Sequence, residues 1–263
     1  MLASGIGFGV MERCHQDSAT PQCLDKDRRM PYRAASPGGE DEKMFPGAHA
    51  EASPDKPAVI VGETGEQMTY QELEHGSRRL AQLLRSRGLR PGDHIALLAE
   101  NHLRYFEVYW AAMRSGLYLT CINRHLVHDE VAYIVNDCGA QALITTVAMS
   151  TTASAALPSI EACPTRFMMD GATTGFESYE DATAAQPADR LAEEPCGSVL
   201  LYSSGTTGRP KGIKRPLSGK TVDDPTGGST SVFERHFMGM DEDSVYMCPA
   251  PLYHAAGLQW TAG

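Results

Sequence analysis

Apolar residues recur at helical spacing in the first strongly patterned part of the chain, between Thr69 and Gly88. Leu73 and Leu80 fall on one face of the predicted helix, as expected for a helix that packs against a core. Thr69 and Glu72 predict a capping box, in which each side chain satisfies a free backbone N–H group of the other residue. Gly88 supplies the stop, because glycine readily adopts the left-handed conformation that ends many helices. The pattern therefore predicts an amphipathic helix.

Short apolar runs alternate with further helical patterns downstream. The predicted strands are residues 94–98, 117–121 and 142–146. One predicted helix is capped by Asn101 and ended by Gly116, and the next spans residues 129–136. Strands that alternate with helices indicate a parallel sheet covered on both faces. The sequence thus predicts an α/β fold with layered parallel sheets flanked by helices.

The remaining segments carry weaker patterns. Residues 1–43 mix Gly, Pro, Cys and both charge signs without periodicity, so we predict a disordered extension before a folded region that starts at Met44. Residues 147–197 are predicted to hold a helix, a strand and a loop-rich connection. Residues 217–231 are rich in Gly, Ser and Asp and are predicted to form a surface loop.

Composition narrows the class of protein. A formal net charge of −10 argues against a general nucleic-acid surface, because duplex binders concentrate excess positive charge. The seven cysteines include no C-x-x-C pair, so they suggest neither a zinc cage nor a disulfide framework. No apolar run reaches the roughly eighteen residues of a transmembrane helix. We therefore expect a cytoplasmic protein, with peripheral membrane attachment as the alternative.

The stretch "YSSGTTGRPKGIKRP", residues 202–216, concentrates groups that bind anions. Its glycines leave backbone N–H groups unshielded, and its Ser and Thr hydroxyls add donors. Four cations supply positive charge: Arg209, Lys211, Lys214 and Arg215. The apolar run 199–202 predicts a buried strand that leads into the loop, which is a common layout at nucleotide sites. These features favour a polyphosphate ligand, and the alternative is a flexible surface linker of similar composition.

The spacing excludes the phosphate loop of kinases and GTPases. That loop requires Gly-Lys followed by Ser or Thr and a helix, whereas Lys211 stands between Pro210 and Gly212. Residues 203–212 instead resemble the signature of the adenylate-forming superfamily, which comprises acyl-CoA synthetases, peptide-synthetase adenylation domains and luciferases. The phrases "PDKPAVIV" and "GDHIALLAEN" are similar to acyl-CoA synthetases, so the resemblance covers about residue 44 to the end.

The resemblance implies a role for each residue of the loop. The residues that would bind the phosphates of ATP are Ser203, Ser204, Gly205, Thr206, Thr207, Gly208 and Lys211. Lys211 would also neutralise charge on the departing pyrophosphate, and Thr207 would contact Mg²⁺. The implied reaction activates a carboxylic acid, with a fatty acid as the expected substrate, to an acyl-adenylate. The acyl group is then transferred to coenzyme A.

A second motif, "CPAPLYHAAGLQW" at residues 248–260, is similar to the segment that lines the acyl pocket in the same superfamily. The resemblance implies that His254 orients the carboxylate or closes its pocket. The alternative is a buried histidine that is satisfied by one backbone hydrogen bond. His125 and His128 show an H-x-x-H spacing, which we interpret as an ordinary helix start, because a zinc site needs three or four ligands.

In the superfamily, the adenine-binding, ribose-binding and C-terminal lysine segments follow the His motif, and this sequence stops before them. We therefore expect the first portion of the large N-terminal domain of an adenylate-forming enzyme. Residues 44–263 would form an incomplete adenylation domain that is inactive by itself. Two alternatives stay open: a peptide-synthetase-type adenylation domain and a non-catalytic phosphate-binding remnant.

Overall fold

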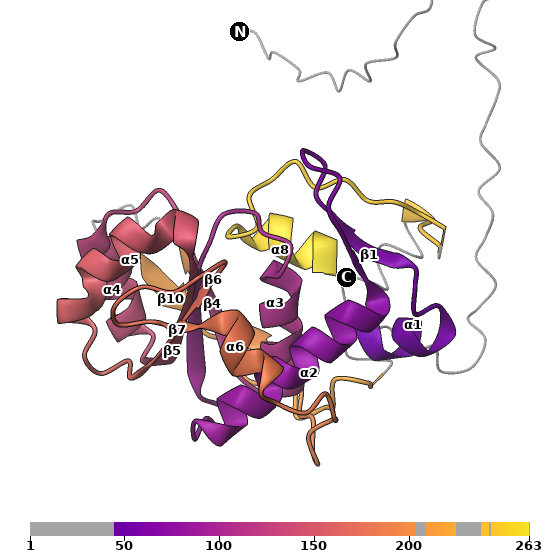
Figure 1. The fold of residues 1–263 in the computed structure, drawn as a ribbon, viewed down its shortest axis with the longest axis horizontal. Helices are drawn as coiled ribbons and strands as arrows, with labels where there is room; N and C mark the ends of the chain where they lie inside the picture. Colours follow the sequence, from indigo (N-terminus) through magenta and orange to yellow (C-terminus); the bar gives the residue numbers. More distant parts are fainter. Residues whose placement is uncertain (1–44, 204–208, 225–237, 242, 263) are drawn as a thin grey trace, which may run out of the picture. The chain divides into compact units, whose positions relative to one another are not determined.

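The computed structural model describes residues 45–203, 209–224, 238–241 and 243–262. The extension predicted over residues 1–43 lies outside these residues and stays a prediction. A six-stranded sheet forms the centre of the described part, and helices cover both of its faces (Figure 1). The predicted α/β architecture is therefore confirmed.

The elements follow one another in a regular order. The strands are β1 Pro57–Ile60, β2 Gln67–Thr69, β3 His94–Leu98, β4 Tyr118–Ile122, β5 Ala140–Thr146, β6 Thr165–Met169, β7 Glu177–Ser178, β8 Ser198–Val199, β9 Leu201–Ser203 and β10 Lys211–Ile213. The α-helices are α1 Pro46–Ala52, α2 Tyr70–Ser86, α3 Tyr105–Arg114, α4 His128–Asp137, α5 Ser150–Ala156, α6 Tyr179–Ala184 and α8 Ala255–Ala262. Two 3₁₀ turns flank α5: η1 Val147–Met149 and η2 Leu157–Ser159.

The central sheet has the strand order β7-β6-β5-β3-β4-β8, and all of its neighbouring strands pair in parallel. The chain passes from β3 to β4 on one side and then crosses back to β5 on the other side of β3. In such doubly wound sheets, ligands bind beyond the carboxyl ends of the strands, where the direction of winding reverses. The topology thus indicates that a ligand would bind beyond the carboxyl ends of β3 and its neighbouring strands.

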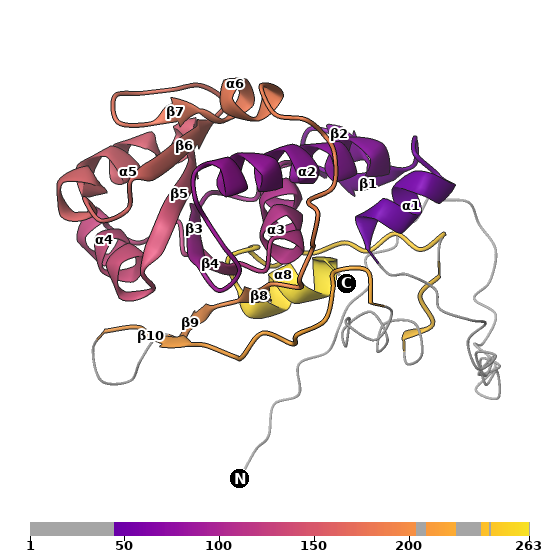
Figure 2. The same cartoon turned by 90° about the horizontal axis from the view of Figure 1, so that it is seen from below.

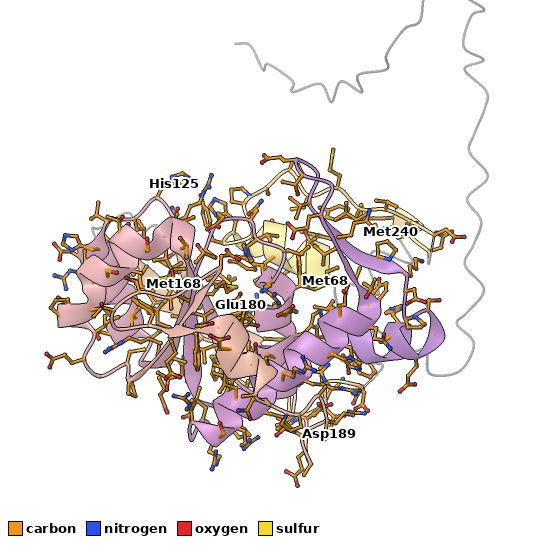
Figure 3. The ribbon with its side chains drawn as sticks, viewed as in Figure 1. Met68, His125, Met168, Glu180, Asp189 and Met240 are labelled. Atoms are coloured by element: carbon orange, nitrogen blue, oxygen red, sulfur yellow. The ribbon has the colours of Figure 1, made fainter. Side chains whose placement is uncertain are left out.

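Successive residues of β3 serve two separate cores. Ile95 and Leu97 pack in a cluster with α2 and α3, whereas Ala96 and Leu98 pack in a cluster with α4 and α5. Figures 1 and 2 show these two helix layers on opposite faces of the sheet. Met168 of β6, labelled in Figure 3, is a fully buried member of the second cluster. Burial on both faces explains why the central strands are almost continuously apolar.

The predicted start and stop of the first long helix are confirmed. At the start of α2, the Thr69 N–H donates to Glu72 Oε2 at 2.8 Å, and the Glu72 N–H donates to Thr69 Oγ1 at 3.2 Å. After its end, Gly88 has a φ of +95°, which an L-residue rarely adopts. A capping box of this kind stabilises a helix by about 1 kcal/mol.

Two sequence expectations for the helices need adjustment. The cap predicted at Asn101 is wrong, because α3 begins at Tyr105 with Arg104 as its N-cap residue. The Asn101 side chain instead bonds to a distant segment, as described below. Between residues 147 and 197, the predicted helix and strand are present as α5 and β6, and the structure adds β7 and α6. These two are short elements with little sequence periodicity.

A buried ionic cluster attaches the segment before β8 to the helices. The Arg114 guanidinium of α3 is fully buried and contacts Glu74 of α2 and Glu194. The backbone at Gly197 also packs tightly against the backbone of Leu117. A Cβ at Gly197 would lie only 2.4 Å from the Leu117 carbonyl oxygen. These contacts fix the approach of the chain to the signature loop.

Candidate functional site

The described residues on either side of the signature loop form a β-hairpin. Strands β9 and β10 are antiparallel, and Ser203 is the partner of Lys211 across the pair. A Cβ at Gly212 would lie 3.1 Å from the Tyr202 ring, which leaves little room for a larger residue there. The strand predicted over residues 199–202 is present as β8 and β9, which are separated at Leu200. The register therefore holds the two ends of the loop beside one another.

Helix α4 anchors both strands of this hairpin. The Tyr202 hydroxyl donates to Asp137 Oδ2 at 2.5 Å, and the Tyr133 hydroxyl donates to the Pro210 carbonyl oxygen at 3.1 Å. The Arg209 guanidinium carbon lies 5.0 Å from the Tyr133 ring centroid, within the range of a cation–π contact. Burial, together with the bond to Asp137, raises the pKa of Tyr202, so its hydroxyl remains a donor.

A second anchor fixes the chain after β10. The Lys214 Nζ atom lies 2.9 Å from His94 Nε2 and 4.3 Å from the Tyr118 ring centroid. Tyr118 also donates its hydroxyl to the Arg215 carbonyl oxygen at 2.8 Å. Desolvation and the Lys214 charge lower the pKa of His94, so a neutral imidazole accepts the bond from the ammonium group.

These contacts divide the cations of the signature region. The side chains of Arg209 and Lys214 lie against aromatic rings of the protein. Lys211 is exposed at the start of β10, beside Ser203. Five predicted phosphate-binding residues lie outside the described residues: Ser204, Gly205, Thr206, Thr207 and Gly208. Their roles stay predictions, as does the Mg²⁺ contact assigned to Thr207.

The second motif lies beside the carboxyl ends of β3 and β4. The Leu252 N–H donates to the side-chain oxygen of Asn101, which follows β3, at 2.9 Å. The Tyr253 ring meets His125, which follows β4 and is labelled in Figure 3, edge to face at a centroid distance of 6.4 Å. His254 is exposed, not buried, and its ring centroid is 4.4 Å from that of Tyr253.

The structure thus brings together Ser203 and Lys211, whereas His254 belongs to a separately anchored segment. In the described part of the chain, no hydrogen bond or ion pair joins Lys211 to His254. Sequence reasoning missed the residues that anchor the motifs, namely Asn101, Tyr133 and Asp137. Each bonds to a partner more than sixty positions away, so no local pattern marks it.

Among the described residues, no three His, Cys, Asp or Glu side chains gather in a way that could hold a metal ion. His128 contacts Asp129 at the start of α4, as the interpretation of a helix start suggests. Of the helices that the structure describes, none combines the length and apolar character needed to span a bilayer.

Curated proteins with similar sequences include several acid–CoA ligases. The chain is 32% identical over 215 residues to a feruloyl-CoA synthase of Amycolatopsis sp., and the match covers 81% of this chain and 40% of the relative. It is 27% identical over 216 residues to the long-chain-fatty-acid–CoA ligase FadD13 of Mycobacterium tuberculosis, with 80% and 40% covered. The chain therefore spans less than half the length of these relatives.

Solved structures share the fold. An anthranilate CoA ligase, AuaEII, in complex with anthranoyl-AMP superposes with a TM-score of 0.68 at 20% identity, covering 84% of this chain and 45% of the other. The N-terminal domain of FACL13 from Mycobacterium tuberculosis gives a TM-score of 0.64 at 23% identity, with 82% and 52% covered.

The parallel sheet and its flanking helices therefore have the same fold as these solved ligase structures. Residues 47–263 match the family of AMP-binding enzymes, and the chain belongs to that family.

Proposed function

We propose that the protein uses ATP to activate a hydrophobic carboxylic acid and transfers the acyl group to coenzyme A. In the first step, a carboxylate oxygen attacks the α-phosphorus of ATP and pyrophosphate leaves. In the second step, the thiol of coenzyme A attacks the acyl carbon and AMP leaves. The relatives that act on fatty, ferulic and coumaric acids support a hydrophobic acid as the substrate.

The pairing of Ser203 with Lys211 is the observation that carries this proposal. A flexible linker would not need its ends to be hydrogen-bonded in register, nor Tyr202 and Pro210 on its two sides to be bonded to α4. Lys211 is an exposed cation at the start of β10, and its neighbours Arg209 and Lys214 contact aromatic rings of the protein. Its ammonium group would bind the β- and γ-phosphates and stabilise the charge that develops on the departing pyrophosphate.

Mg²⁺ enters this proposal only as a partner of the phosphates. The described residues offer no protein-built metal cluster, and Thr207 lies outside them. His254, exposed at the carboxyl side of the sheet, would orient the substrate carboxylate and not act as a nucleophile.

Substitution of Lys211 tests the proposal. A charge-assisted hydrogen bond contributes about 1.5 to 3 kcal/mol, so Lys211→Ala in a complete enzyme of the relatives' length that contains this chain should slow ATP–pyrophosphate exchange roughly ten- to hundredfold. Arg79→Ala, at an exposed position on α2, is the control for loss of one positive charge and should leave the rate within about twofold. An equal rate in Lys211→Ala and the control would sink the assignment of the loop.

A carrier-protein thiol is the second candidate for the acyl acceptor. The chain is 30% identical over 167 residues to ScoC of Streptomyces coeruleorubidus, a fatty acid–[acyl-carrier-protein] ligase. Both acceptors use the same first step, so the exchange assay does not separate them. Mass spectrometry of the acylated product, with coenzyme A and a carrier protein supplied together, decides between them.

A further inference from the structure

The loop between β3 and α3, residues 99–104, contacts the second motif, residues 248–260, which contains His254. Asn101 Oδ1 accepts a hydrogen bond from the Leu252 N–H at 2.9 Å, and the two residues are 151 positions apart. Leu252 is 6% exposed, so its amide lies where an unpaired donor would be costly. The contact therefore joins the carboxyl end of the central strand to the second motif.

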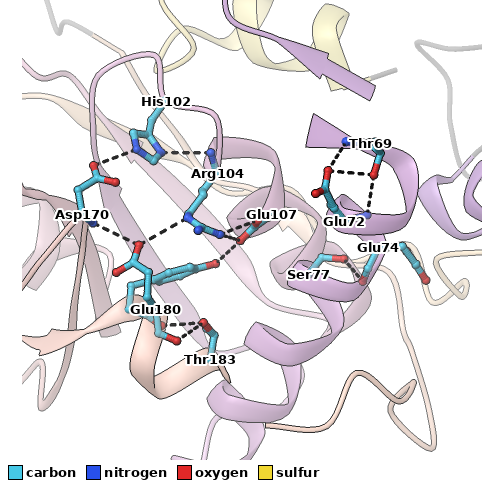
Figure 4. A network of polar contacts seen from close by, with 11 residues as sticks. Thr69, Glu72, Glu74, Ser77, His102, Arg104, Glu107, Asp170, Glu180 and Thr183 are labelled. Carbon is cyan, nitrogen blue, oxygen red and sulfur yellow. Dashed lines mark hydrogen bonds and ion pairs between the residues drawn. The ribbon is translucent and has the colours of Figure 1, made fainter. Parts of the chain in front are cut away.

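The loop that carries Asn101 is held at both of its ends. Glu100 Oε2 accepts a bond from the Thr146 hydroxyl at 2.7 Å, which ties the loop to the end of β5. His102 Nδ1 accepts from the Arg104 N–H at 3.1 Å, so the ring proton is on Nε2, which lies 3.0 Å from Asp170 Oδ2. This second bond ties the loop to the end of β6, as Figure 4 shows.

The network in Figure 4 extends from the loop into the core of the α2, α3 and α6 layer. Arg104 contacts Glu107 at 3.0 Å and Glu180 at 3.5 Å, and the Tyr179 hydroxyl donates to Glu107 Oε2 at 3.0 Å. Burial raises the pKa of Glu107, and Arg104 opposes that effect. Since these partners belong to packed helices, Asn101 presents its oxygen from a rigid support.

The receiving segment is equally constrained. The His254 N–H donates to the Pro251 carbonyl oxygen at 3.1 Å, and the Leu258 N–H donates to the His254 carbonyl oxygen at 2.9 Å. A Cβ at Gly257 would lie 2.5 Å from the Pro251 oxygen, so the turn packs directly against α8. A shift of the Leu252 amide would therefore move His254, two residues farther along the same turn.

We infer that Asn101 is a positioning residue, which places His254 beside the carboxyl ends of β3 and β4 through its bond to Leu252. This inference rests on the proposed function for its chemical meaning, because His254 is the residue expected to face the substrate carboxylate. Asn101 itself acts only through the Leu252 amide. The oxygen of its side chain is the functional atom, and its NH₂ group is dispensable for this contact.

Two substitutions at Asn101 separate the oxygen from the shape of the side chain. Asn101→Leu keeps a similar volume but removes the acceptor, whereas Asn101→Asp keeps an acceptor oxygen. The matched control is Asn136→Leu, which removes a different asparagine bond, from Asn136 Nδ2 to the Ser159 carbonyl oxygen at 2.7 Å. The full chain is used for every variant.

The first readout is hydrogen exchange at the Leu252 amide, followed by NMR together with the ring resonance of His254. Asn101→Leu should speed the exchange roughly two- to twelvefold, the range expected for one net hydrogen bond, and should shift the His254 resonance. Asn101→Asp and Asn136→Leu should leave both unchanged. If neither quantity responds to Asn101→Leu, the positioning role is overturned, whatever reaction the protein catalyses.

The second readout is the Michaelis constant of the adenylation step. Asn101→Leu should raise KM for the carboxylate roughly two- to twelvefold, while KM for ATP stays within about twofold of the wild-type value. Asn101→Asp should have the wild-type KM for the carboxylate. Equal carboxylate KM values in Asn101→Leu and Asn136→Leu would also overturn the role. The Leu252 and His254 signals need no turnover, so they decide the positioning role alone if the isolated chain shows no pyrophosphate exchange, whereas an unchanged exchange rate in Lys211→Ala refutes the proposed function instead.

Discussion

Replacing Arg114 with methionine tests the buried ionic cluster that attaches the segment before β8. The side chains of Arg114, Glu74 and Glu194 are 0%, 3% and 2% exposed, so water does not solvate their charges. Arg114 Nη1 lies 3.1 Å from Glu74 Oε1 and 3.3 Å from Glu194 Oε1. Methionine has a comparable volume, so Arg114→Met removes the positive charge without opening a large cavity.

The expected loss is large because two carboxylates lose a shared partner. Removing one member of a buried ion pair costs about 3 to 5 kcal/mol where the remaining charge is left uncompensated. Glu74 keeps a contact with Arg78 Nε at 2.7 Å and Glu194 keeps one with Arg190 Nη2 at 2.6 Å, so we expect the lower end of this range, about 3 kcal/mol. That is a sizeable part of the roughly 5 to 15 kcal/mol that stabilises a typical domain. A folded unit of this size shifts its thermal midpoint by about 2 to 4 °C per kcal/mol, so Arg114→Met should lower it by about 6 to 12 °C.

Thermal unfolding followed by circular dichroism provides the measurement. Arg79→Met is the control, because it removes one positive charge from an exposed position on α2 and should change stability by less than about 0.5 kcal/mol. If the midpoints of Arg114→Met and Arg79→Met agreed within about 2 °C, the cluster would not stabilise the fold, and the reasoning from burial would be refuted.

Two further predictions concern the anchors of the hairpin. Tyr133→Phe removes the hydroxyl bonded to the Pro210 carbonyl oxygen and keeps the ring beneath Arg209, so tryptic cleavage after Lys211 should become roughly two- to twelvefold faster. Tyr70→Phe on α2 is its control, and equal cleavage of the two variants would contradict the anchoring role. The lowered pKa of His94, which faces Lys214, Asp93 and Tyr118, means that the unfolded chain binds the proton more readily. The free energy of unfolding should therefore fall as the pH drops below about 6.5. Urea titrations between pH 7.5 and 5.5 should show a smaller fall in His94→Gln than in the wild-type protein. An equal pH dependence in the two proteins would contradict this role of His94.

The sequence by itself determined the α/β class and the order of its central elements. Helices and strands have local periodicities, and the residues that end them act on their immediate neighbours. The capping box of Thr69 and Glu72 was predictable for this reason, as was the glycine stop at Gly88. The family was equally predictable, because the residues 203–212 that resemble its signature are contiguous in the sequence.

Only the tertiary structure decided which distant residues meet. Asn101 has the sequence of a helix cap, yet its oxygen pairs with the Leu252 amide, since a buried donor from another segment competes for the same acceptor. Arg209 and Lys214 look equivalent to Lys211 in a run of cations, but rings from α4 and β4 lie beside the first two. Hydrophobic burial selects the packing of the layers, and that packing determines which polar groups come within hydrogen-bonding reach of one another.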